Sequence, residues 1–138
     1  MSIEKGVLHV HSVFSDGEES LDRLVETLRL AGMSFAAVSD HAEVFDDRRM
    51  QDYVGICDAL CTHSFTVIPG LEFGLHGGDI HILGYGITRR VHFKNMEELV
   101  DGIHEEGGIA VLAHPHRLVG PPQYPVWLFP TLPPGVPH

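Results

Sequence analysis

The sequence predicts a single α/β domain built on a mainly parallel sheet. Short apolar runs alternate with amphipathic helical patterns along the chain, and most of the strand-like runs are apolar on both faces. This combination is typical of parallel strands that are covered by helices on their faces. The chain has 138 residues, 43% of them hydrophobic, which is enough for one core.

The first strand is predicted at Val7–His11, where two imidazoles interrupt an apolar run. Alternate side chains of a strand leave from the same face, so His9 and His11 point the same way. Two adjacent neutral imidazoles form half of a divalent-metal site, although an isolated pair is more often a surface feature of an edge strand. The rest of the chain has to decide between the two interpretations.

Three helices are predicted from apolar stripes at helical spacing together with start and stop signals. The first follows Ser20 as N-cap and closes at Gly32. The second runs from about Asp47 to Cys61, and the third starts at Asn95 with a capping box completed by Glu98, then stops at Gly107-Gly108.

Four more strands are predicted between and after these helices. They cover Ser34 to Ser39, Phe65 to Leu71, Ile80 to Tyr85 and Ile109 to Ala113. The Pro69-Gly70 pair bends or ends the third strand of the chain and delivers Glu72 just past its end.

Polar residues that can bind metals lie at or near the end of one strand after another. They are His9, His11, Asp40, His41, Glu72 and His114, while the predicted strand Ile80 to Tyr85 carries His81. In α/β folds the reactive groups gather at the carboxyl ends of the strands, so we expect these side chains to converge. A mixed set of imidazoles and carboxylates suits Zn, Mn or Fe, and a carboxylate can bridge two ions.

The composition limits the classes of partner that we expect the chain to bind. The net charge of −10 argues against a nucleic-acid or anionic-membrane surface, although bound cations would offset part of it. Cys57 and Cys61 lie in an apolar helical pattern and are expected in the core. The chain shows neither a signal-peptide pattern nor roughly 18 consecutive apolar residues, so we expect a soluble cytoplasmic protein without a membrane partner.

The ordered set of motifs resembles the PHP family, the polymerase and histidinol phosphatase domain. The motifs that carry the resemblance are His9-Val10-His11-Ser12 with Ser15-Asp16-Gly17, Ser39-Asp40-His41, Pro69-Gly70-Leu71-Glu72-Phe73, His81, and Ala113-His114-Pro115-His116. The match runs from Val7 to about Arg117, and within the family it is most similar to small bacterial phosphoesterases.

The resemblance implies a distorted (βα)7 barrel, of which this chain is a partial version, and two to three divalent ions (Mn, Zn or Fe). Hydrolysis of nucleotide or other phosphate esters by a metal-bridging hydroxide follows from it. The implied metal ligands are His9, His11, Asp16, His41, Glu72, His81 and His114, with Glu72 bridging. Asp40 is implied to orient a histidine, a histidine such as His114 to protonate the leaving oxygen, and His116 or Arg117 to face substrate phosphate.

The chain departs from the family pattern after His116, where no late Asp-x-His motif appears. We therefore divide it into a partial PHP domain at 1–118 and a proline-rich irregular tail at 119–138, since residues 121–138 hold seven of the nine prolines. A truncated remnant, a fragment of a longer chain and an apolar flap over an open sheet edge are all consistent with such a tail. Homo-oligomerisation through that edge is a further alternative.

Three functions compete at this point. The first is a metal-dependent phosphoesterase acting on a phosphorylated small molecule or nucleotide, with nucleic acid only as a substrate. The second is a non-catalytic metal-binding or structural PHP remnant. The third is an amidohydrolase-like hydrolase of C–N or C–O bonds, because its ligand chemistry overlaps.

Overall fold

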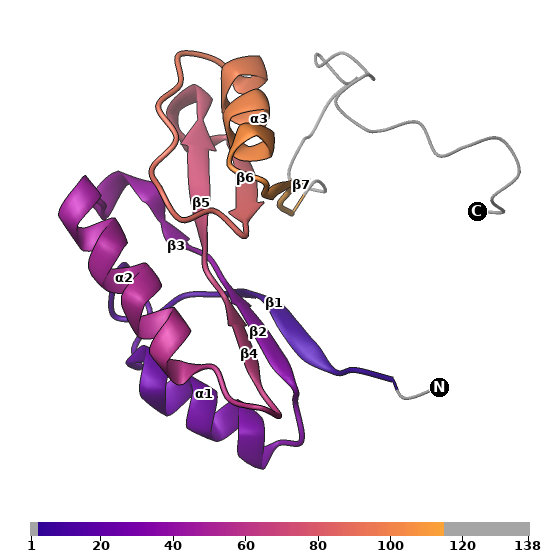
Figure 1. Ribbon diagram of the computed structural model, residues 1–138. Helices are drawn as coiled ribbons and strands as arrows, with labels where there is room; N and C mark the ends of the chain where they lie inside the picture. The colour runs from indigo at the N-terminus through magenta and orange to yellow at the C-terminus, as the bar shows by residue number, and fades with distance from the viewer. Residues whose placement is uncertain (1–2, 115–138) are drawn as a thin grey trace, which may run out of the picture.

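The computed structural model describes residues 3–114 and shows two sheets with three α-helices (Figure 1). The strands are β1 (Gly6–Val10), β2 (Phe35–Val38), β3 (Asp40–His41), β4 (Thr66–Ile68), β5 (Gly70–Leu75), β6 (Ile80–Tyr85) and β7 (Ile109–Leu112). The helices are α1 (Leu21–Leu30), α2 (Asp47–Leu60) and α3 (Met96–Glu105), with short 3-10 turns at Ala42–Val44 and His76–Gly78.

The first sheet is parallel throughout and has the order β1-β2-β4. The register pairs Val10 with Val38 and Ala37 with Ile68, so these strands end at the same edge of the sheet. Helices α1 and α2 lie along one side of this sheet (Figure 1), and α2 packs against β4. This half of the chain has the parallel arrangement that the alternating pattern predicts.

The second sheet is mixed, so the predicted parallel pairing extends to one of its three strand pairs. Its order is β3-β5-β6-β7, and β3 pairs with β5 in parallel. Strand β6 is antiparallel to both of its neighbours, β5 and β7. The short turn at His76–Gly78 explains the antiparallel pairing of β6 with β5, because a parallel connection needs a crossover of a dozen or more residues.

The predicted strand Phe65 to Leu71 is two strands that belong to different sheets. β4 ends at Ile68, and β5 begins at Gly70 and continues to Leu75. Glu72 therefore lies inside β5. The prediction that it follows the end of a strand is wrong. Gly70 allows this crossing, since a Cβ there would lie 2.7 Å from the Gly84 carbonyl oxygen and 2.8 Å from that of Val38.

The helix boundaries follow the signals in the sequence. Gly32 (φ 77°) and Gly107 (φ 79°) close α1 and α3 with left-handed residues, and the N–H of Met33 donates to the Leu28 carbonyl in a Schellman motif. The Asn95 side chain accepts from the Glu98 N–H at 2.9 Å. Ser20 holds the N-cap position of α1 without a capping side-chain hydrogen bond.

The two faces of the sheets have different roles. One face packs under the helices and contains most of the core, including Ala36, Val38 and Phe73. The opposite face carries a small cluster of Ala37, Leu83, Tyr85 and Ala113. Glu72 pairs with Leu83 across β5 and β6, so its side chain rises from this second face, which the helices do not cover.

Among residues 3–114, no helix is both long and apolar enough to cross a membrane. The tail predicted at 119–138 and the end of the predicted domain, 115–118, lie outside the described residues. The closure of a seven-stranded barrel stays a prediction, because the described strands form two separate sheets.

Candidate metal centre

The carboxylate of Glu72 is the centre of a cluster of imidazoles. Its side chain is buried, with the residue only 1% exposed, and both of its oxygens face histidines. Five imidazoles lie within 3.6 Å of these oxygens: His9, His11, His41, His81 and His114. They come from both sheets, so the site exists only when the two sheets are assembled.

Three ligand atoms form a compact triangle on one side of this carboxylate. The Nε2 atoms of His9 and His11 lie 3.1 Å apart, and Glu72 Oε2 lies 3.3 Å and 3.0 Å from them respectively. An ion bound at about 2.0–2.1 Å from each of three ligand atoms holds them about 3 Å apart. The spacing of these atoms therefore fits a divalent ion.

Asp16 adds a second group of ligands beside the first. Its Oδ1 lies 2.7 Å from His11 Nδ1 and its Oδ2 lies 3.3 Å from His41 Nε2. The ligand atoms of His11, Asp16 and His41 all lie within 4.8 Å of one another, as do those of His9, Glu72 and His114. The structure thus offers two neighbouring groups of three side chains that could each hold an ion.

His81 and His114 face the other oxygen of Glu72. His81 Nδ1 lies 2.7 Å from Glu72 Oε1, and His114 Nε2 lies 3.2 Å from the same oxygen. Within residues 3–114, His81 Nδ1 is buried without a partner in hydrogen-bond geometry. Two ligands of one metal ion also lie close together without a hydrogen bond between them. This side of the carboxylate therefore also fits a metal ion.

Contacts with histidines lower the pKa of both carboxylates. Burial alone would raise the pKa of Glu72, but the nearby charges of His9 and His81 and a hydrogen bond from His9 bring it below its ordinary value. The hydrogen bond from His11 lowers the pKa of Asp16, and the charge of His41 adds to this effect. Both groups therefore stay ionised, as metal ligands must.

Asp40 is close to the cluster in sequence but is held by other groups. It is fully buried, and its carboxylate accepts from the Ser12 N–H and hydroxyl, the Ser15 hydroxyl and the Tyr53 hydroxyl, at 2.6–2.9 Å. These bonds come from the loop that follows β1 and from α2, not from an imidazole. The role of Asp40 in orienting a histidine stays a prediction from the resemblance.

All seven predicted metal ligands converge in the structure. The five histidines meet Glu72, which stands on β5, from β1, the loop after it, β3, β6 and the segment just after β7. Asp16, in the loop after β1, joins them through His11 and His41. His81 reaches the cluster from the beginning of β6, because that strand runs antiparallel. His116 and Arg117 lie outside the described residues.

Sequence reasoning missed the residues that hold Asp40. Ser12 and Ser15 belong to the motifs around Asp16, and their closeness to Asp16 in the sequence could have indicated a role near the site. Tyr53 gave no such signal, because it belongs to the apolar stripe of α2 and is fully buried there.

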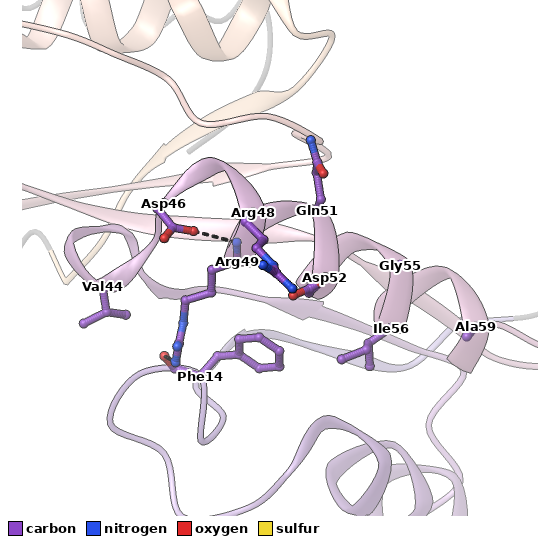
Figure 2. A pocket seen from close by; sticks show the side chains of 10 residues that line it. All are labelled: Phe14, Val44, Asp46, Arg48, Arg49, Gln51, Asp52, Gly55, Ile56 and Ala59. Atoms are coloured by element: carbon purple, nitrogen blue, oxygen red, sulfur yellow. Dashed lines mark hydrogen bonds between the residues drawn. The ribbon is translucent and has the colours of Figure 1, made fainter.

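A shallow groove lies between α2 and the loop that carries Phe14 (Figure 2). Arg48, Arg49, Asp52 and Ile56 also line it. None of the predicted metal ligands is among its lining residues, so the metal cluster is a separate feature of the surface.

Fold and cluster together define an α/β protein with a histidine and carboxylate metal site. The family model of the PHP domain matches residues 8–118. The chain belongs to the PHP family.

Two solved structures are similar to this chain. One is a two-domain protein from Bacteroides vulgatus containing a predicted PHP-like metal-dependent phosphoesterase, with 20% identity and a TM-score of 0.58 over 78% of this chain and 34% of the other. The second is a protein from Bifidobacterium adolescentis assigned as a metal-dependent phosphoesterase, with 25% identity and a TM-score of 0.44 over 59% and 27%. The chain thus spans about a third of the first structure. No curated protein matches it.

Proposed function

We propose that this PHP chain is a metal-dependent phosphoesterase that hydrolyses nucleotide or other phosphate esters. The observation that carries the proposal is the buried Glu72 carboxylate, which faces imidazoles on both of its oxygens. One carboxylate placed between two groups of ligands is suited to bridge two ions.

The residues of the chain would divide the work as follows. His9, Glu72 and His114 would hold one ion, and His11, Asp16 and His41 would hold a second one beside it. His81 would add an imidazole at Glu72 Oε1. When bound, Mn, Zn or Fe would supply Lewis acidity that lowers the pKa of water and offsets charge on the phosphoryl oxygens. Glu72 and Asp16 stay ionised for this purpose, while His116 and Arg117 are proposed to contact substrate phosphate.

The charge of the chain supports a role for bound cations in substrate binding. A protein with a net charge of −10 repels phosphate esters unless local positive charge offsets it. Two or three divalent ions at the cluster would reverse the local sign and attract an anionic substrate. A phosphorylated small molecule or a nucleotide fits such a site, with nucleic acid only as a substrate.

Hydrolysis of p-nitrophenyl phosphate and of short oligonucleotides with added Mn²⁺ tests the proposal. We expect turnover by the wild-type chain and its loss in the double variant His9→Ala, His11→Ala. The variant His63→Ala, which changes an exposed histidine outside the cluster, is the matched control. Turnover by the double variant at the wild-type rate, or by neither protein, contradicts the proposal.

A second candidate is a metal-binding PHP module without turnover. The observation that favours it is that two groups of described side chains could each hold an ion without any residue that contacts substrate: His9, Glu72 and His114, and His11, Asp16 and His41. A rise in Tm on adding Mn²⁺, without hydrolysis of any phosphoester, would identify this function.

A further inference from the structure

Tyr53 lies on α2, outside all of the family motifs, yet it is connected to the metal cluster through one buried carboxylate. Tyr53 and Asp40 are both fully buried, and the Tyr53 hydroxyl lies 2.9 Å from Asp40 Oδ2. Burial, and then the charge of Asp40, raise the pKa of Tyr53 far above its ordinary value. The hydroxyl therefore stays protonated and can donate a hydrogen bond to Asp40.

The remaining bonds of Asp40 all go to the loop that follows β1. Its Oδ1 accepts from the Ser12 N–H at 2.8 Å and from the Ser15 hydroxyl at 2.6 Å, and its Oδ2 accepts from the Ser12 hydroxyl at 2.8 Å. These donors are neutral, so the buried carboxylate depends on hydrogen bonds rather than on an ion pair. Removal of one donor would leave part of a buried charge unsatisfied.

The same loop carries Asp16 into the cluster. Ser15 lies directly before it, and the Ser15 hydroxyl is also 3.3 Å from Asp16 Oδ1. The N–H groups of Ser15 and Gly17 donate to the Ser12 carbonyl at 3.0 Å and 2.9 Å, which winds the loop tightly. A Cβ at Gly17 would collide with the carbonyl of His11, so the loop and the His11 ligand form one compact unit.

Helix α2 holds this loop at a second point. Arg49 donates from Nη2 to the Phe14 carbonyl at 2.8 Å, and Figure 2 shows its side chain reaching across from the helix to Phe14. The rings of Phe14 and Phe45 pack edge-on against Tyr53, each at 5.0 Å between centroids. The position of the loop therefore depends on the helix.

We propose that Tyr53 is a positioning residue for the metal centre, acting through Asp40 on the Ser12–Gly17 loop and so on Asp16. The inference rests on the proposed metal site, but not on turnover. Its direct consequence is that loss of one hydroxyl on α2 weakens metal binding at the His11, Asp16 and His41 group. Mutation of a residue that orients the ligands of a metal site commonly lowers metal affinity by roughly 10- to 100-fold.

The test compares Tyr53→Phe with Phe65→Leu in the full 138-residue chain. Both residues are buried in the main core, and Phe65 directly precedes β4, at the beginning of a strand, whereas the ligands of the first sheet lie toward the strand ends. Mn²⁺ affinity is measured by calorimetry, and urea unfolding of the metal-free chains is measured alongside. We expect Tyr53→Phe to weaken Mn²⁺ binding about tenfold or more, and Phe65→Leu to lower stability while leaving Mn²⁺ affinity unchanged.

Ser15→Ala provides a second approach that leaves the core intact, because Ser15 is partly exposed. It removes a different donor from the same carboxylate, so it should also weaken Mn²⁺ binding. The double variant should lose less affinity than the product of the two single losses, since both substitutions remove a hydrogen-bond donor from Asp40.

The outcomes separate this inference from the proposed function. Unchanged Mn²⁺ affinity in Tyr53→Phe, with lower stability of the metal-free chain alone, makes Tyr53 a merely structural residue and overturns the inference while leaving the phosphoesterase proposal intact. Weakened Mn²⁺ binding in a chain that hydrolyses no phosphoester supports the inference and overturns the phosphoesterase. A wild-type chain that binds no Mn²⁺ overturns both.

Discussion

Glu72 Oε1 and His81 Nδ1 lie 2.7 Å apart although their residues stand on antiparallel strands. Glu72 pairs with Leu83 and His81 pairs with Gly74, so the two residues are diagonal neighbours on the same face of the sheet. The reversal of the chain at His76–Gly78 therefore brings an imidazole from the start of one strand beside a carboxylate in the middle of another.

Glu72→Gln should remove most of the metal binding while preserving the shape of the site. The amide replaces a charged ligand that faces imidazoles on both sides, and neutral amides are weaker ligands for Mn or Zn. We expect at least about a 100-fold weaker Mn²⁺ affinity by calorimetry. Asp79→Asn is the matched control, because it neutralises a carboxylate outside both groups of ligands; equal losses in the two variants would contradict the bridging role.

His81→Ala should weaken metal binding because it removes an imidazole that faces Glu72 Oε1. The expected loss is roughly 10- to 100-fold in Mn²⁺ affinity, measured by the same titration. His104→Ala changes a histidine on the exposed side of α3 and should leave the affinity unchanged. If His81→Ala binds Mn²⁺ as tightly as the wild type, His81 is a neighbour of the metal site rather than a ligand.

Gly70→Ala should destabilise the fold where the chain passes from β4 to β5. The new methyl would meet two backbone carbonyl oxygens at 2.7–2.8 Å, and backbone cannot move away as easily as a side chain. We expect a loss of about 1–3 kcal/mol in the free energy of unfolding, measured with urea. Gly55→Ala provides the control, because its Cβ on α2 would meet nothing within 4 Å and should stabilise the helix by about 0.5–1 kcal/mol.

Asn95→Ala should lower stability by about 1 kcal/mol through loss of the α3 N-cap. The Asn95 side chain accepts the Glu98 N–H at 2.9 Å, and alanine leaves that donor without this acceptor. Asn95→Asp keeps a capping oxygen and should be close to wild type in urea unfolding. A loss in the aspartate variant as large as in the alanine variant would show that the amide group, not the cap, matters.

The convergence of the candidate ligands could be predicted from the sequence, but their geometry could not. His9 and His11 could be paired because a strand repeats every two residues, and this period survives in the structure. The direction of β6 leaves no trace in such a period, so the sequence placed His81 correctly in a strand without showing which end of the sheet it reaches. Only the sheet topology of the structure shows to which end of the sheet His81 belongs.

Glu72 and Tyr53 illustrate two further limits of sequence reasoning. The pair Pro69-Gly70 predicts a bend or the end of a strand. In the structure the chain passes from the first sheet to the second at these residues and continues as strand β5. Tyr53 shares the spacing of core residues such as Met50 and Cys57, and spacing cannot show that its hydroxyl meets a buried carboxylate. Only the packed structure separates a core tyrosine from one that also holds a loop.

The stacked rings of His9 and His114, 5.6 Å apart between centroids, join the first strand of the described chain to the end of its last. Contacts between residues so distant in sequence close a long loop, and they form late when a protein folds. A metal ion held by both ends would favour the fully folded chain over every partly folded form. Metal uptake is then a kinetic marker of complete folding, and a slow phase in uptake after dilution from urea should match the last phase of folding.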